Sequence, residues 1–91
     1  MYFTYILQSE STGRYYVGST DNLDRRVAQH NDPDYKGSKT TKRFKGPWKL
    51  VYTESSQTRA EAMSREREIK SWKSRKAIQG LIINSVGKVS T

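Results

Sequence analysis

The sequence predicts an α+β domain, a small three-stranded antiparallel sheet flanked by helices in the order ββαβαα. Three observations support this fold class. Short segments rich in aromatic and β-branched residues indicate strands, and later segments with helical spacing and capping residues indicate helices. The length of 91 residues suits one domain, residues 1–91, with one modest core.

The strands follow from composition and turn signals. Residues 2–8 are aromatic and β-branched, and Thr12 with Gly13 marks a turn. Residues 15–19 resemble a second strand, so the first two strands form a hairpin with a loop of several residues. Apolar and polar residues alternate sufficiently along residues 48–53 to predict the third strand.

The first helix is expected to begin after Asp21 or Thr20, either of which can cap it, and to run to about His30. Asn31 and Pro33 then end the helix. The polar and basic segment 31–46 is predicted to be a long surface loop, a length that is uncommon without a function.

Two further helices complete the domain. Thr58 followed by Glu61 forms a capping box that opens a helix to about Lys73. Ser74 can cap a last short helix through Ile83. The ordered core is therefore expected to cover about residues 2–83, with a frayed tail after it.

The chain is strongly basic, with 17 Lys and Arg against 9 Asp and Glu and a formal net charge of +8. Small basic domains usually bind a polyanion such as nucleic acid, although a charged surface can also serve solubility alone. The charge is clustered in the loop and after Glu68, which favours the polyanion. The residues predicted to contact nucleic acid are Lys39, Lys42, Arg43, Lys45, Lys70 and Lys73.

The composition also limits compartment and metal chemistry. Without cysteine there is no disulfide framework, and the single histidine excludes a multi-histidine zinc site. A bound metal should be hard and oxygen-liganded, such as Mg²⁺ or Mn²⁺. The N-terminus lacks the pattern of a signal peptide, and the apolar run 81–83 is too short to span a bilayer. We therefore expect a soluble, cytoplasmic protein that does not bind membranes.

Helical spacing separates candidate site residues from solvent-facing ones. At about 100° per residue, Leu23 and Val27 define the buried stripe of the first helix, and Arg26 and His30 flank it on one edge. Arg25 faces solvent. The alternatives are a surface ion pair for Arg26 and, for His30, a charged histidine held by the last carbonyls of the helix.

In the capped helix, Glu66 lies on the same side as the apolar residues Ala62 and Ile69, whereas Glu61 and Glu68 face solvent. A glutamate on a buried face is costly unless it is paired or holds a metal. The alternative to a metal is a structural salt bridge with Arg26, Lys70 or Lys73.

Tyr5 and Tyr16 lie on successive strands, where aromatic residues are usually core. Their neighbours change this interpretation. The chain contains Phe3-Thr4-Tyr5 and Tyr16-Val17-Gly18, followed by Arg26, His30 and the stretch 65–70. In these residues it resembles the GIY-YIG nuclease superfamily. The similarity covers about residues 2–83. The members that the chain resembles are the small stand-alone bacterial ones, which are similar to the N-terminal domain of excinuclease C.

The resemblance implies a role for each matching residue. It implies that Tyr5 is a general base assisted by His30, and that Tyr16 places water or phosphate. Arg26 would contact the phosphate, Glu66 would bind one Mg²⁺ or Mn²⁺ ion, and the structural residue Gly18 allows close backbone approach. All five side chains are expected to converge in one shallow cleft beside the hairpin.

The sequence departs from the family pattern at Phe3 and Thr4, which replace the glycine and isoleucine of the first motif. Asn84 is a candidate for an additional active-site asparagine. A phenol is a poor base at neutral pH, so Tyr5 should need a nearby cation to favour the phenolate, from Arg26, His30 or the metal.

The leading hypothesis is a metal-dependent endonuclease acting on DNA, with RNA left open, of low base specificity and structure-selective. The alternatives are a non-catalytic nucleic-acid-binding module and a basic domain that docks an acidic protein. A partner protein that supplies specificity is also left open.

Overall fold

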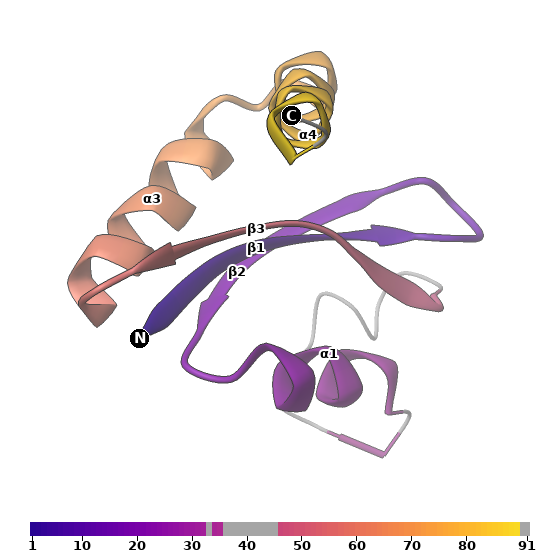
Figure 1. Cartoon of the computed structure of the whole chain (residues 1–91). Coiled ribbons are helices and arrows are strands. Elements are labelled where there is room, and N and C mark those ends of the chain that lie inside the picture. Colours follow the sequence, from indigo (N-terminus) through magenta and orange to yellow (C-terminus); the bar gives the residue numbers. More distant parts are fainter. Residues whose placement is uncertain (33, 36–45, 90–91) are drawn as a thin grey trace.

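The fold class predicted from the sequence is confirmed. The computed structural model describes residues 1–32, 34–35 and 46–89, with side chains described to residue 84. Its three strands form an antiparallel sheet in the order β2-β1-β3, and its helices cover both faces (Figure 1). The elements are β1 (Tyr2–Ser9), β2 (Tyr15–Thr20), α1 (Leu23–Asn31), β3 (Trp48–Ser56), α3 (Arg59–Ser71) and α4 (Arg75–Val89).

The central strand β1 organises the domain because its alternate residues enter two separate cores. Tyr5 and Leu7 pack with Trp48 on the face covered by α1, against Leu23 and Val27. On the opposite face, which α3 and α4 cover in Figure 1, the core is formed by Ile6, Val17 and Ile69. Since β1 is covered on both faces and paired on both edges, it is the most buried strand of the sheet.

The hairpin register places Tyr5 directly opposite Gly18 and Leu7 opposite Tyr16. Residues that face each other across two strands point to the same side of the sheet. Tyr16 and Gly18 therefore share the α1 face with Tyr5, whereas Val17 and Ser19 point toward α3.

Side-chain hydrogen bonds fix the ends of α1. The N-cap is Asn22, whose side chain accepts a hydrogen bond from the Arg25 backbone N–H. The expectation that Asp21 or Thr20 caps this helix was wrong, because Asp21 pairs with Arg25 and the Thr20 hydroxyl accepts from Asn22 N–H. At the other end, the Asn31 amide makes two hydrogen bonds with the Trp48 backbone, of 2.8 and 2.7 Å. Asn31 thus ties α1 to β3.

The later helices differ in length from the sequence prediction. Thr58 caps α3 as expected, but the helix ends at Ser71, and Lys73 lies outside it with a positive φ of 48°. Ser74 accepts from Ala77 N–H, and α4 extends to Val89 rather than ending near Ile83. Within the predicted part of this helix, Ile78, Leu81 and Ile82 pack against the second core.

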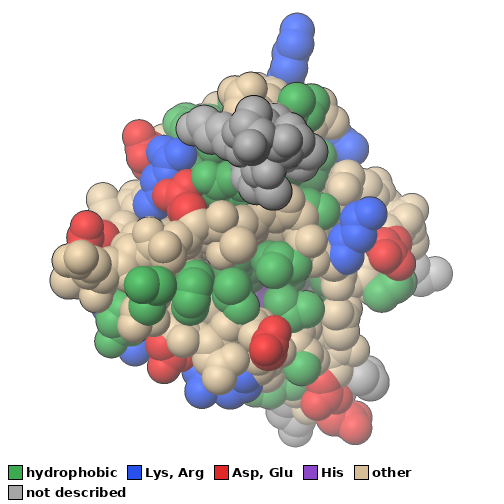
Figure 2. Space-filling model, viewed as in Figure 1, with side chains coloured by type: hydrophobic (Ala, Val, Ile, Leu, Met, Phe, Trp, Pro, Cys, Tyr) green, Lys and Arg blue, Asp and Glu red, His purple; other side chains and the backbone are tan. Residues whose placement is uncertain are grey.

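No helix in the described part of the chain is long and apolar enough to cross a membrane. In the view of Figure 2, basic and acidic side chains are scattered around a row of hydrophobic ones. Positive charge is therefore not gathered on this face.

Candidate active site

The site begins with a buried hydrogen bond between a strand and a helix. The Tyr5 hydroxyl lies 2.8 Å from His30 Nε2. Tyr5 is 1% exposed and His30 is 3% exposed, so both rings are held by packing. β1 fixes the tyrosine and the last turn of α1 fixes the histidine. A strand and a helix that are adjacent in the fold thus hold two proton-transfer groups in contact.

Tyr16 and Gly18 complete the surroundings of this pair. The Tyr16 ring lies 4.7 Å from the His30 ring and 6.3 Å from the Tyr5 ring, between centroids. Gly18 is required by the close approach of Tyr5, because a Cβ at this position would lie 2.5 Å from the Tyr5 hydroxyl oxygen. The absence of a side chain at Gly18 therefore creates the space that the phenol occupies.

Burial determines whether His30 and Tyr5 carry a charge. It lowers the pKa of His30 to about 4, with the Arg26 charge acting in the same direction. His30 is therefore neutral at pH 7, and the alternative of a charged histidine at the helix C-terminus was wrong. In the tautomer protonated on Nδ1, its Nε2 accepts a hydrogen bond from the Tyr5 hydroxyl.

Burial also raises the pKa of Tyr5, and this outweighs the hydrogen bonding of Arg26, which lowers it. Of the two side chains expected to favour the phenolate, Arg26 lowers the pKa of Tyr5, but by less than burial raises it. Arg26 acts in the expected direction but His30 carries no charge. Tyr5 is a neutral phenol that is hydrogen-bonded to a neutral imidazole.

Arg26 is half-buried beside the tyrosines and makes no surface ion pair among the described residues. Its guanidinium donates to Gln29 Oε1 at 3.0 Å and to the Tyr35 hydroxyl at 3.4 Å. It also lies over the Tyr35 ring, 5.9 Å from the centroid. These neighbours, Gln29 and Tyr35, orient the group that the sequence analysis assigned to a phosphate.

Glu66 reaches the site from the other face of the sheet. Its Oε1 accepts a hydrogen bond of 2.8 Å from the Ser19 hydroxyl, and its Oε2 accepts one of 2.7 Å from the Lys70 ammonium. The salt bridge considered from the sequence is therefore present. Because β2 is an edge strand, Ser19 brings the carboxylate next to Gly18, and its charge acts on Tyr5.

The five predicted residues therefore meet around a sheet edge and not in one cleft. Tyr5, Tyr16, Arg26 and His30 gather under α1, and Glu66 joins them across the end of β2. The reason is that α1 and α3 lie on opposite faces of the sheet. The residues predicted to face solvent, Arg25, Glu61 and Glu68, are exposed as expected.

Sequence reasoning missed Ser19 as a partner of Glu66. The strand period of two could have found it, because Ser19 follows Val17 by two residues and must share its face. It also missed the contribution of Tyr35 beside Arg26. No local pattern connects these two, since the contact depends on how the chain turns after α1.

The remaining predicted residues are spread over the surface. Lys70 and Lys73 are exposed near the second core, and Asn84 is exposed on α4. Lys39, Lys42, Arg43 and Lys45 lie outside the described residues.

The donor set at Glu66 fits only a weakly held, mostly hydrated ion. In the described part of the chain, no group of three or more His, Cys, Asp or Glu side chains could hold a metal. One carboxylate with a hydroxyl beside it offers hard oxygen ligands, which suit Mg²⁺ or Mn²⁺. The carboxylate is 23% exposed, so water can complete a coordination shell.

The chain is similar to known proteins over most of its length. The family model described as the GIY-YIG catalytic domain matches residues 1–79. The chain belongs to this family. It is 44% identical over 70 residues to a UPF0213 protein of Halobacterium salinarum, covering 77% of this chain and 86% of that protein.

A solution NMR structure of a GIY-YIG relative has the same fold. It is the UPF0213 protein BH0048 from Bacillus halodurans, with a TM-score of 0.53 and 33% identity, covering 90% of this chain and 83% of that one. The structure-specific endonuclease subunit SLX1 of Homo sapiens is 43% identical over 51 residues. That match covers 56% of this chain and 18% of SLX1.

Gly18→Ala should displace the Tyr5 hydroxyl and break its bond to His30, since the added Cβ would lie 2.5 Å from that oxygen and 3.0 Å from the Tyr16 ring. The His30 ring resonances should shift in NMR spectra. Gly80→Ala is the matched control, because a Cβ there meets nothing within 4 Å. Its resonances at His30 should match the wild type. Equal His30 spectra in Gly18→Ala and wild type would contradict the proposed packing.

Stability should fall as the pH is lowered from about 6.5 to about 4. In this window the unfolded histidine binds a proton that the folded His30 does not, so the free energy of unfolding drops, by roughly 3 kcal/mol in full. Denaturant titrations at several pH values measure the slope. His30→Gln should remove this part of the slope. An unchanged slope in that variant would show that His30 does not carry it.

Proposed function

We propose that this protein is a metal-dependent endonuclease that hydrolyses phosphodiester bonds in DNA. The single observation that carries the proposal is the buried Tyr5–His30 hydrogen bond, which ends beside Gly18 and the Glu66 carboxylate at an open strand edge. Family membership supports nuclease activity in general, and the name of the human relative supports a structure-specific endonuclease.

The geometry suits a proton relay. The phosphodiester requires an attacking water whose proton is removed as its oxygen bonds to phosphorus and the bond to the leaving oxygen breaks. Tyr5 accepts that proton while giving its own to His30 Nε2, so no free phenolate forms. Because an incoming phosphate is negative, it opposes the Arg26 charge that lowers the pKa of His30, which makes the imidazole a better acceptor.

Two groups stabilise the charge of the phosphate. Arg26 can donate to a non-bridging oxygen, and its contacts with Gln29 and Tyr35 limit the positions it can adopt. A divalent ion on Glu66 would stabilise the charge that develops on the leaving oxygen. The Ser19 hydroxyl orients Glu66 through Oε1, so Oε2, which pairs with Lys70, is the oxygen that would hold the ion.

Selectivity should come from DNA shape. The described helices and strands include no separate element for reading base sequence, and charged contacts to phosphates carry no sequence information. A partner protein that adds selectivity fits this proposal, since the human relative is named as a subunit.

A non-catalytic nucleic-acid-binding module is the second candidate. The observation that favours it is the Glu66–Lys70 ion pair, which a purely structural glutamate would also form. Cleavage of plasmid and branched DNA by the purified protein, with Mg²⁺, with Mn²⁺ and with excess chelator, separates the two functions. Full activity in chelator would refute metal dependence, and no cleavage under any condition would favour the binding module.

Glu66→Gln should abolish cleavage and leave DNA binding largely intact, because it removes the charged metal ligand but keeps the side-chain shape. Glu68→Gln is the matched control, since Glu68 is an exposed residue of the same helix that pairs with Arg65. It should cleave at close to the wild-type rate. Gel assays of cleavage and fluorescence anisotropy of binding give the two readouts. Cleavage by Glu66→Gln at the wild-type rate would exclude a metal at this carboxylate.

Lys70→Met should tighten Mn²⁺ binding in the absence of DNA, because the ammonium competes with the ion for Glu66 Oε2. Lys70 is half exposed, and an exposed pair contributes about 0.2–1 kcal/mol, so the gain should reach at most about fivefold. Lys73→Met is the control with the same change in charge. Electron paramagnetic resonance of free Mn²⁺ measures the affinity. Equal effects of both variants would indicate general charge rather than competition at Glu66.

A further inference from the structure

The described part of the chain contains a groove beside the site that the catalytic proposal does not use. It has a volume of about 420 Å³ and is lined by the start of β2, the end of α3 and the start of α4. Its basic residues are Arg14, Lys70, Lys73 and Arg75, and no Asp or Glu is among its lining residues. We refer to it as the Arg75 groove. Its charge indicates an anionic ligand.

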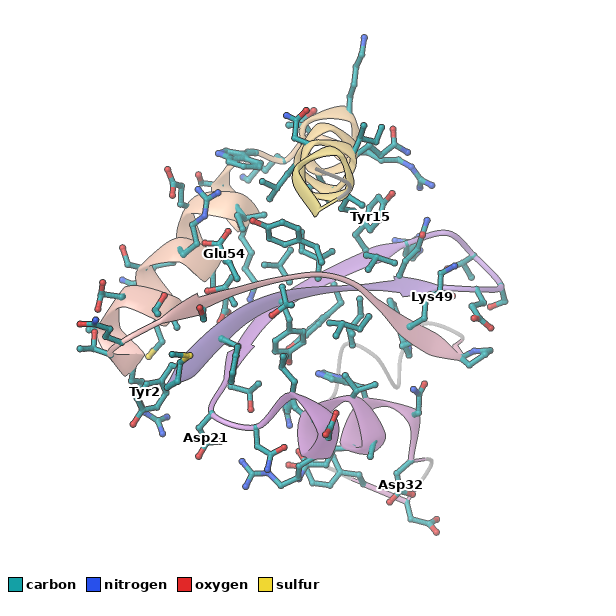
Figure 3. All side chains as sticks on the ribbon, viewed as in Figure 1. Tyr2, Tyr15, Asp21, Asp32, Lys49 and Glu54 are labelled. Carbon is teal, nitrogen blue, oxygen red and sulfur yellow. The ribbon has the colours of Figure 1, made fainter. Side chains whose placement is uncertain are left out.

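Arg75 is held in place before any ligand arrives. Its guanidinium lies over the Tyr15 ring, 5.4 Å from the centroid, and Tyr15 lies beneath α4 in Figure 3. It also packs against Gly13, where a Cβ would be 3.0 Å from Arg75 Nη2. Gly13 has a φ of 77°, which a residue with a side chain rarely adopts. A guanidinium fixed in this way loses little freedom on binding.

The groove is continuous with the candidate active site. Tyr16 lines it and contacts His30, and Lys70 lines it and pairs with Glu66. Lys70 also lies over the Tyr16 ring, 5.8 Å from the centroid. A ligand in the Arg75 groove is therefore next to the phosphate that the site would cleave.

A second pocket, of about 370 Å³, lies at the other end of β2. It is lined by Ser19 and Thr20 and contains Arg26 and Arg59. The six residues of β2 span about 17 Å, along which one strand of B-form DNA presents about five phosphates. The two pockets therefore lie at opposite ends of β2, a span that covers several successive phosphates of a single strand.

We propose that the nucleic-acid strand to be cut runs along the outer edge of β2, with two phosphates of its flanking backbone bound in the Arg75 groove, one by Arg14 and one by Arg75. This inference rests on the proposed function, since the strand is the one whose scissile phosphate meets Tyr5 and Glu66. It assigns Arg14 and Arg75 as substrate-binding residues. The aromatic and apolar lining, including Tyr15, Tyr16 and Val17, contacts the sugar and base without reading sequence.

The test compares two double variants with the same loss of charge. Arg14→Gln with Arg75→Gln removes the two guanidiniums but keeps polar side chains, and Arg67→Gln with Lys76→Gln removes two exposed charges outside the groove. All proteins also carry Glu66→Gln to prevent cleavage. Anisotropy with a fluorescein-labelled 20-base-pair duplex and a labelled twelve-residue oligothymidylate is measured across a range of salt concentrations.

The affinity of the groove variant should be at least tenfold lower than that of the parent protein, for whichever of the two probes the parent binds more tightly. Its slope of log K against log salt should be reduced by about 1.8 for duplex or about 1.4 for single strand, as expected for two lost phosphate contacts. The control variant should keep the slope within about 0.5 of the parent. The inference would be overturned if both double variants lost affinity and slope equally, or if neither lost any. Arg75→Lys, which keeps the charge, should retain the slope and shows that the fold tolerates change at this position.

Failure of the inference and failure of the proposed function give different results. If the wild-type protein cleaves DNA with Mg²⁺ but the groove variant binds like the control, only the groove assignment is wrong. If the protein never cleaves but the groove variant alone loses its salt slope, the groove binds nucleic acid and the nuclease proposal is wrong.

Discussion

The hydrogen bond between Tyr5 and His30 is the interaction on which the arrangement of the site depends. It joins the central strand to the last turn of α1 in a place where neither partner can be satisfied by bulk water, because both are almost fully buried. Gly18 must then lack a side chain, and α1 must end where His30 reaches the sheet. The same burial keeps both rings uncharged, which suits them to pass a proton and not to hold a charge.

The small number of strands is the second feature that determines how the site is arranged. With three strands in the order β2-β1-β3, the central strand β1 lies only one strand from an edge. Glu66, which comes from the opposite face, therefore lies close enough around β2 for its charge to act on Tyr5. The edge also leaves room for an extended polyanion, and basic pockets lie at both ends of it.

Part of the site could be predicted from sequence because it depends on local periodicity. Helical spacing placed Arg26 and His30 beside the buried stripe of α1, and it separated Glu66 from the exposed Glu61 and Glu68. The partners of these residues could not be predicted. Ser19 and Lys70 share the two oxygens of Glu66, and Tyr35 joins Arg26, through contacts that depend on how distant elements pack.

The sequence by itself determined the fold class, the hairpin, the capping box at Thr58 and the identities of the groups available for chemistry, since these depend on neighbours in the chain. Only the tertiary structure decided their charge and position. Burial made His30 neutral and raised the pKa of Tyr5. Packing of α3 on the face opposite α1 brought Glu66 to the site around the edge of β2. Desolvation and the side of the sheet are properties of the packed domain, and no local pattern encodes them.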